Sequence, residues 1–216
     1  MKKTDSTTGF QLITLFIVLL ILFIHSNQVI AKEKKESPIF KKWDKSISKY
    51  ELEDKQNPPP KDPILFIGAS NFRRWDVKKS FPDLPVINRG FGGAMIKEMI
   101  YFMDRIVYPY KPKMIILYGG ANDMSRGRLN PEQVFDDYKT FVKKVHDKFP
   151  EIKIVFLSLP HFYKHRNNPE AIAKVDQVNK LILTETLKDK RLEFVEINKS
   201  MEDKEGVPRA ELFVKD

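Results

Sequence analysis

Cysteine is absent from the 216-residue chain, and its absence excludes three kinds of chemistry. The protein forms no disulfide, has no thiolate nucleophile and carries no lipid on a cysteine at a signal-peptide cleavage site. A basic stripe with interleaved aromatic residues is also missing, because the 38 lysines and arginines are scattered among 29 acidic residues. We therefore expect no nucleic acid partner. The net charge of +9 instead favours contact with a membrane surface or an anionic envelope polymer.

The N-terminal region lacks an apolar run long enough for a comfortable transmembrane helix. Its apolar block, Leu12 to Ile24, is shorter than the roughly 20 residues that a spanning helix needs. Two lysines precede this block and Val29-Ile30-Ala31 follows it, an order typical of a secretory signal peptide cleaved after Ala31. Residues 1–31 are expected to be this signal, or an uncleaved anchor if the helix covers residues 10–31. The protein is expected to be exported, either periplasmic or extracellular, or anchored to the membrane.

Residues 32–60 are expected to form an amphipathic helix followed by a proline-rich linker. The segment is highly charged, but apolar side chains recur at three- and four-residue steps, as Phe40, Trp43, Ile47 and Tyr50. This spacing places them on one helical face, which would pack on the domain that follows. Three consecutive prolines at 58–60 then end the helix, so the domain is expected to cover residues 61–216.

Short apolar strands alternate with amphipathic helices from residue 61 onward. Strands are predicted at 64–67, 85–88, 113–118, 153–159 and 192–197. Helices are predicted at 94–107 and after each of two Asn-Pro pairs, at 130–131 and 168–169. Strands that are apolar throughout indicate an α/β fold whose mostly parallel five-stranded sheet is covered on both faces. Ligands of such sheets bind outside the carboxyl ends of the strands.

Three consecutive strand ends carry groups suited to acyl transfer. The first ends in Gly68-Ala69-Ser70-Asn71, and Ser70 can act as a nucleophile once a base removes its proton. The second leads into glycines 90, 92 and 93, which permit a sharp turn and expose an amide N–H. The third leads into Asn122, which offers side-chain N–H donors. An amide and a carboxamide aimed at one point beside Ser70 would form an oxyanion hole.

These blocks resemble the SGNH, or GDSL-type, hydrolase superfamily over roughly residues 43–216. The matching motifs are GASNFRRW at the first strand end, NRGFGGA at the second and Gly120-Ala121-Asn122-Asp123 at the third. The resemblance implies a flavodoxin-like three-layer α/β/α fold and an esterase, lipase or other acylhydrolase activity. It also implies that Ser70 is the nucleophile and that Gly93 and Asn122 form the oxyanion hole. Neither a metal nor an organic cofactor is expected.

The sequence departs from the superfamily pattern at two places. Ala69 replaces the usual aspartate or serine before the nucleophile. The final Asp-x-x-His block corresponds to Asp216, so the resemblance implies that Asp216 orients a catalytic histidine three positions further on. The sequence is therefore expected to be truncated before this histidine and the final helix. His161 and His165 follow the fourth strand at the correct end of the sheet, but solvation is the favoured role for both.

The natural substrate is not encoded in the motifs. Export and positive charge favour an acylated small molecule, a lipid or a polysaccharide ester of the cell envelope. A non-catalytic or degenerate SGNH-fold binding protein is the main alternative, because Ala69 departs from the pattern and no base is evident. A nucleotide- or flavin-binding domain is disfavoured, since Met95 stands where the dinucleotide motif requires glycine. His146, expected to be exposed on a helix, has no evident role.

Overall fold

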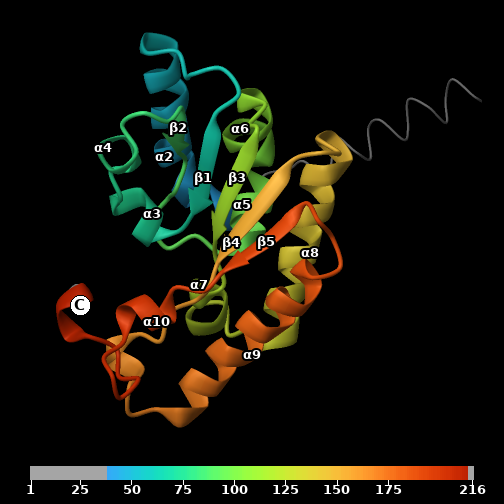
Figure 1. Cartoon of the computed structure of the whole chain (residues 1–216). Helices are drawn as coiled ribbons and strands as arrows, with labels where there is room; N and C mark the ends of the chain where they lie inside the picture. The colour runs from blue at the N-terminus through green and yellow to red at the C-terminus, as the bar shows by residue number, and fades with distance from the viewer. Residues whose placement is uncertain (1–37, 214–216) are drawn as a thin grey trace, which may run out of the picture. The chain divides into compact units, whose positions relative to one another are not determined.

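Five parallel strands form a single sheet in the computed structural model, which describes residues 38–213 (Figure 1). The strands are β1 (Ile64–Gly68), β2 (Val86–Asn88), β3 (Met114–Tyr118), β4 (Lys153–Leu157) and β5 (Leu192–Val195), and their order is β2-β1-β3-β4-β5. All five predicted strands are present, which confirms the α/β fold. The chain leaves β1 first toward β2 and later passes to β3 on the other side, so the topological switch point lies beside the end of β1.

Nine α-helices surround the described part of the sheet. They are α2 (Pro38–Gln56), α3 (Ser70–Arg74), α4 (Val77–Ser80), α5 (Ile96–Tyr101), α6 (Met103–Ile106), α7 (Ala121–Ser125), α8 (Pro131–Lys148), α9 (Pro169–Thr186) and α10 (Asn198–Met201). Helices α5, α8 and α9 contact one another in sequence and form one layer (Figure 1). Because parallel crossovers are right-handed, α3 and α4, which connect β1 to β2 in the opposite direction, lie on the other face. The fold is thus three-layered.

The long helices α8 and α9 begin at the two Asn-Pro pairs, as the sequence predicts. The Asn130 side chain accepts a hydrogen bond from the Gln133 amide at 2.9 Å, and the Gln133 side chain accepts one from the Asn130 amide at 3.0 Å. This reciprocal capping satisfies two amides at the start of α8. The buried stripe of α8 includes Tyr138, whose ring meets Phe156 of β4 edge-on at 5.5 Å. Packing on the sheet therefore stabilises α8 more than helix propensity does.

The single helix predicted at 94–107 is divided into α5 and α6. Phe102 interrupts it with φ −91° and ψ 7°, outside the helical range. The Phe102 side chain is nonetheless buried, and its ring lies 6.0 Å from that of Phe91. A one-residue interruption hardly changes which side chains face the core, so apolar periodicity alone did not reveal it.

Helix α2 confirms the predicted amphipathic helix from Pro38 onward, and a compact unit begins within it at Trp43. Ile47 is completely buried, and the Trp43 ring meets Phe91 edge-on at 5.5 Å. Within residues 38–213, no helix has the length and apolar character needed to cross a bilayer. The expected signal segment, residues 1–31, lies outside the described residues.

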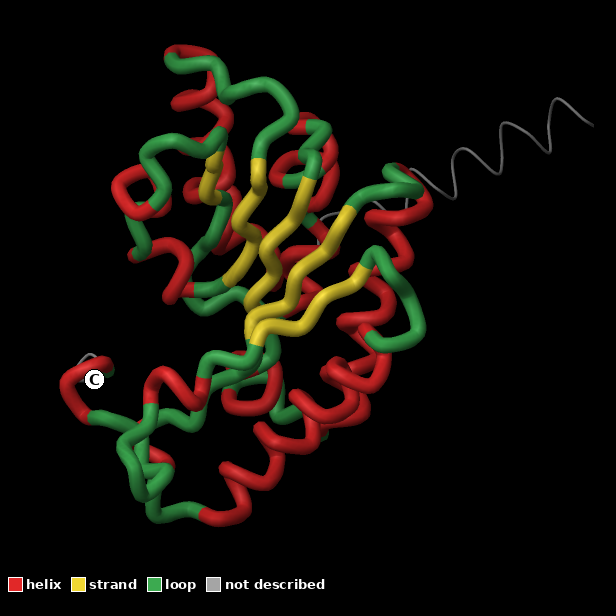
Figure 2. Tube along the Cα trace, viewed as in Figure 1, coloured by secondary structure: helices red, strands yellow, loops and turns green. Residues whose placement is uncertain are grey.

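Several short helices and turns of the fold lie at the C-terminal ends of the strands. Strands β3, β4 and β5 converge there, and the short helices α7 and α10 lie just beyond them (Figure 2). The 3-10 turns η2 (Tyr163–His165) and η3 (Ala210–Leu212) belong to the same region. Long helices packed on the sheet thus form the body of the domain, whereas 3-10 turns and short helices lie at the C-terminal end of the sheet.

Candidate active site

Ser70 is the first residue of α3 and is half-exposed. Aromatic rings from the same stretch of sequence fix this short helix on the sheet. The Phe66 ring lies 5.5 Å from Phe72 and 5.4 Å from Trp75, both in edge-on contacts. Ala69, just before the serine, is 4% exposed, so its methyl group packs where a polar side chain is usual. A helix of five residues has little stability alone, so this packing determines where Ser70 lies.

Two asparagine side chains tie α3 to the neighbouring strands. Asn71 donates to the Tyr118 hydroxyl at the end of β3, at 3.1 Å. Asn88, at the end of β2, donates through Nδ2 to the carbonyls of Phe72 and Trp75 at 2.6 and 2.9 Å. Its Oδ1 accepts from the Gly90 amide at 2.9 Å. Helix α3 is therefore connected to both strands that flank β1.

The turn after β2 that contains Gly90, Gly92 and Gly93, here called the glycine turn, packs against the end of β1. The Phe91 amide donates to the Gly68 carbonyl at 3.0 Å. A Cβ atom at Gly90 would lie 2.7 Å from the Arg73 nitrogen in α3, so only glycine allows this close approach. Gly93 has φ +70°, a conformation that residues with side chains rarely adopt. Among the described residues, the Gly93 amide donates to no acceptor, and the Ser70 hydroxyl likewise forms no hydrogen bond.

The turn after β3 is hydrogen-bonded to the glycine turn. Asn122 donates from Nδ2 to the Ala94 carbonyl at 3.0 Å, and Asp123 accepts the Ile96 amide through Oδ1 at 2.9 Å. Parallel pairing sets Gly68 of β1 opposite Tyr118 of β3. The turns that carry Ser70, Gly93 and Asn122 thus lie at one end of the sheet and are connected by hydrogen bonds. Their catalytic roles remain predictions.

Asp123 is a buried acid that the sequence analysis did not single out. It is fully buried, and Oδ2 has no hydrogen-bond partner among the described residues. Burial raises the pKa of Asp123 to about 6, although the Ile96 amide acts in the opposite direction. Through Oδ1 it holds the first amide of α5, immediately after the glycine turn. We assign Asp123 a positioning role: it connects the turn that carries Asn122 to the start of α5, just after the glycine turn.

A buried arginine, Arg89, directly precedes the glycine turn and anchors it. The sequence analysis did not identify this residue. The Arg89 guanidinium lies between two tyrosine rings, 4.9 Å from the Tyr50 centroid and 4.8 Å from the Tyr110 centroid. It pairs with Asp54, while Nε donates to the Tyr110 hydroxyl at 2.7 Å. That hydroxyl in turn donates to Asp54 at 2.6 Å. Burial, with the hydrogen bond to Asp54, raises the pKa of Tyr110 to about 12, so it stays protonated as a donor.

Helix α2 supplies half of this Arg89 cluster. Tyr50 and Asp54 both come from α2, and the Tyr50 hydroxyl also donates to the Gly90 carbonyl. In addition, the Trp43 ring lies 3.5 Å from the position that a Cβ atom on Gly93 would occupy. Helix α2, which was expected only to pack on the domain, is therefore in contact with the glycine turn that contains Gly93. The only sequence signal was the helical spacing of Trp43, Ile47 and Tyr50.

The three described histidines that could act as a base lie in different environments. His146 is half-buried, which corrects the expectation of an exposed side chain, and Nε2 lies 3.1 Å from the Ile152 carbonyl. Ile152 precedes β4, so His146 lies at the opposite end of the sheet from Ser70. His161 contacts Asp176 and Glu202, with both nitrogen-to-oxygen distances 2.7 Å. Both of its ring nitrogens are engaged, which makes it a poor proton acceptor for Ser70.

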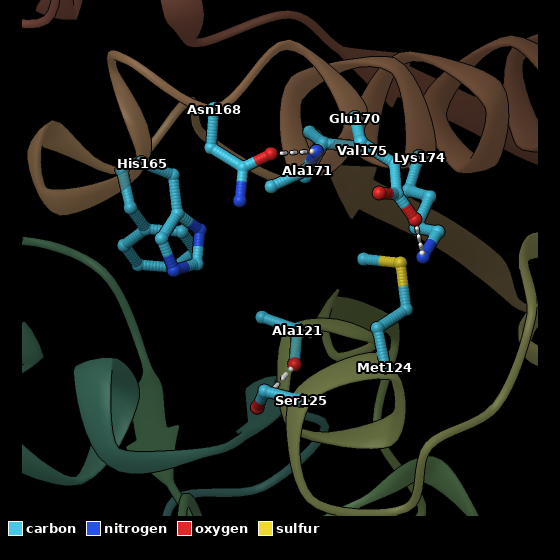
Figure 3. A pocket seen from close by; sticks show the side chains of 10 residues that line it. Ala121, Met124, Ser125, His165, Asn168, Glu170, Ala171, Lys174 and Val175 are labelled. Carbon is cyan, nitrogen blue, oxygen red and sulfur yellow. Dashed lines mark hydrogen bonds and ion pairs between the residues drawn. The ribbon is translucent and has the colours of Figure 1, made fainter.

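His165 lies in a pocket between α7 and the start of α9 (Figure 3). Burial, with the nearby charge of Lys164, lowers the pKa of His165, so the imidazole is neutral at neutral pH. The predicted orienting residue Asp216 lies outside the described residues. Within residues 38–213, no group of three or more His, Asp or Glu side chains is arranged to hold a metal ion.

A comparison with known families matches residues 68–214 to the GDSL-like lipase/acylhydrolase family. The chain belongs to this family. The match begins two residues before Ser70 and contains the glycine turn and Asn122, so it covers every described block on which the site was predicted. Family membership supports hydrolase activity in general terms and does not specify the ester.

Solved structures of the same fold come from several bacteria. A Streptococcus pneumonia protein provisionally assigned as a platelet activating factor has 18% identity and a TM-score of 0.69, covering 88% of this chain and 89% of its own. A GDSL-like lipase from Bacteroides thetaiotaomicron has 18% identity and a TM-score of 0.65, covering 79% and 86%. At this identity the likeness shows the fold alone. No curated protein matches the sequence.

Removal of the Asp54 carboxylate should destabilise the fold by about 3 kcal/mol. Asp54→Ala would leave the Arg89 charge buried without its partner, and breaking such a pair typically costs about 3–5 kcal/mol. We expect the lower value because Asp54 keeps 20% of its side-chain exposure. Urea unfolding measures the change. The control is Glu53→Ala in the same helix, which removes an exposed pair with Lys49 and should cost less than about 1 kcal/mol. Equal losses in the two variants would contradict the role of the cluster.

The His161 contacts should stabilise the fold more in acid than in alkali. Burial alone lowers the pKa of His161, but its hydrogen bonds to Asp176 and Glu202 outweigh this and raise the pKa above 6.5. The stabilisation is therefore complete below the unfolded-state pKa and is lost as the pH rises through the folded-state pKa. The melting temperature of wild type minus that of His161→Gln should fall between pH 6 and pH 9.

His165 provides a control of opposite sign. Since the pKa of His165 is lowered, the unfolded state binds more protons, and its contribution to stability should increase as the pH rises. The difference between wild type and His165→Gln should thus change in the other direction. The same pH trend in both variants would indicate a general effect and would refute the assignment to the His161 contacts.

Proposed function

We propose that the protein is a serine hydrolase that cleaves carboxylic esters through an acyl-enzyme on Ser70. One observation carries the proposal: the turns bearing Ser70, Gly93 and Asn122 are hydrogen-bonded to one another at the C-terminal end of the sheet. Half-exposed Ser70 would supply the nucleophile, and the unengaged Gly93 amide would supply a donor. Membership of the GDSL-like lipase/acylhydrolase family supports the same class of reaction.

The reaction proceeds in two acyl-transfer steps. A base removes the Ser70 proton while Oγ attacks the ester carbonyl, and the resulting oxyanion accepts hydrogen bonds from the Gly93 amide and the Asn122 carboxamide. The base returns the proton to the leaving alcohol, which departs and leaves the acyl group on Ser70. Water, deprotonated by the same base, then releases the acid and restores Ser70. The base in this proposal is a histidine, the side chain that most often accepts the serine proton in such reactions.

A non-catalytic envelope binding protein is the second candidate. The buried methyl of Ala69 favours it, because the residue before the nucleophile lacks the usual polar group. The engaged state of His161 also leaves this histidine without a free nitrogen for catalysis. The two candidates differ in the reactivity of Ser70: only a hydrolase needs an activated serine, whereas a binding protein needs only the pocket at this end of the sheet.

The proposed substrate is an acylated lipid, polysaccharide or small molecule of the cell envelope. Export by a signal at residues 1–31 would bring the enzyme to such esters, and the net charge of +9 would favour anionic surfaces. A membrane-surface contact is proposed on the same basis. No cofactor is required by the acyl-transfer steps.

Substitution of Ser70 and Asn122 tests the mechanism. The protein should hydrolyse p-nitrophenyl acetate, and Ser70→Ala should abolish this activity. Asn122→Ala should lower kcat by about 10²- to 10³-fold with little change in KM, since it removes one oxyanion donor. Asn57→Ala, on an exposed residue beyond α2, is the matched control and should be neutral.

The binding alternative is tested in the same preparation with a fluorophosphonate probe. Mass spectrometry should place the adduct on Ser70 alone. A folded wild-type protein that neither hydrolyses esters nor reacts with the probe would refute the hydrolase proposal and favour the binding protein.

Export is tested by the mass of the mature protein. Cleavage after Ala31 should give a product that begins at Lys32, and Ala31→Leu should block cleavage because the site needs a small residue. Ala31→Gly is the control that keeps cleavage. If the wild-type protein retains residues 1–31 after export, the segment is an uncleaved anchor and the signal-peptide proposal fails.

A further inference from the structure

We propose that the pocket between α7 and the start of α9 binds the acyl chain of the substrate and selects chains of medium length. The inference rests on the proposed function, because it names the ester that Ser70 would cleave. The pocket has a volume of about 210 Å³ and lies beside the turn that carries Asn122. It is separate from the groove lined by Phe135 and Leu181 farther along α9.

The walls of the pocket are mainly apolar (Figure 3). Helix α7 contributes Ala121 and Met124, and the Met124 thioether extends into the space between the two walls. Helix α9 contributes Ala171 and Val175 on the opposite side. Phe162, in the loop after β4, completes the lining, and its ring contacts Phe213 at a centroid distance of 6.2 Å. A ligand that fills this space would exchange water for hydrocarbon contacts.

The polar groups around the pocket are largely occupied by the protein itself. Glu170 and Lys174 pair with each other at 2.7 Å, with Glu170 78% exposed at the rim. The Ser125 hydroxyl donates to the Ala121 carbonyl at 2.8 Å, and Asn168 Oδ1 accepts the Ala171 amide at 3.0 Å. His165 is neutral at neutral pH because its pKa is lowered. The pocket therefore offers no unpaired charge to an anion, and its chemistry suits an alkyl chain.

The position of α7 connects the pocket to the reacting carbonyl. Ala121 and Met124 line the pocket, while Asn122, between them in the same helix, is the proposed oxyanion donor. Residues of one helical turn lie within about 5 Å of one another along the axis, but Asn122 points to another side of α7, toward the Ala94 carbonyl. The acyl chain is bonded to the carbonyl carbon whose oxygen Asn122 would contact. A chain that leaves this carbon and passes along α7 toward α9 would enter the pocket.

The volume limits the length of the chain. With a volume of about 210 Å³, the pocket has room for an acyl chain of several methylene groups. We therefore expect the preferred acyl chain to have about six to eight carbons. Longer chains would extend into solvent at the rim beside Glu170 and Lys174 and gain little further binding.

A series of p-nitrophenyl esters with C2 to C16 acyl chains tests this preference at constant leaving group. Because burial of each CH₂ contributes about 0.8 kcal/mol, kcat/KM should rise about fourfold per methylene and level off near C8. Ala171→Leu fills the pocket from α9 without touching the proposed catalytic residues. It should lower kcat/KM for the C8 ester at least tenfold and leave the C2 ester unchanged.

Ala173→Leu is the matched control, since it makes the same change on an exposed position of the same helix. It should preserve the whole chain-length profile. A flat profile in wild type, or equal effects of the two leucine variants, would overturn the assignment of the pocket while leaving ester hydrolysis by Ser70 intact.

A binding measurement separates this inference from the proposed function. In Ser70→Ala protein, calorimetry should detect methyl octanoate binding that Ala171→Leu weakens at least tenfold and Ala173→Leu does not. If this result is obtained while the wild type hydrolyses no ester, the pocket is supported and the hydrolase proposal fails. If methyl octanoate does not bind, or binds equally to all three proteins, the pocket proposal is wrong.

Discussion

Parallel pairing of β1 with β3 is the constraint on which the candidate site depends. The register sets Gly68 opposite Tyr118, so the turns after the two strands begin at the same level of the sheet. The glycine turn joins them through the amide of Phe91, which donates to Gly68, and through Ala94, which accepts from Asn122. A shift of one residue in the register would separate these turns and also reverse the face of every side chain in the strand. The register of the β1–β3 pair therefore determines the geometry of the candidate site.

The groups proposed for chemistry are small, and larger residues beneath them supply the rigidity. Phe66, Phe72 and Trp75 hold the helix that begins at Ser70, whereas Arg89 and its partners in α2 hold the glycine turn. A buried charge is costly unless it is paired and hydrogen-bonded, so the Arg89 cluster tolerates few alternative arrangements. This intolerance suits a turn whose amide is proposed to act as an oxyanion donor. Helix α2, although first in sequence, thereby becomes part of the support of the site.

The sequence predicted the strands, the two capped helices and the three polar blocks, because each depends on local pattern. Apolar runs, Asn-Pro caps and glycine turns can each be recognised from a few consecutive residues. The interruption at Phe102 was not predictable, since the buried face continues through it. The pairing of Arg89 with Asp54 and the engagement of His161 by Asp176 and Glu202 join residues far apart in the chain. Such contacts exist only after the helices have packed, so no local pattern reveals them.

Strands β2 and β5 form the two borders of the sheet, and their shortness affects more than the fold. Each has three or four residues, so few backbone groups remain available for a strand of another molecule. Glu193 in β5 also pairs across the sheet surface with Lys153 at 2.6 Å, which places charge at that border. Short borders oppose intermolecular strand addition, and charge adds to this effect at β5. The two borders thus offer little backbone to the edge-to-edge pairing by which strands of separate molecules aggregate.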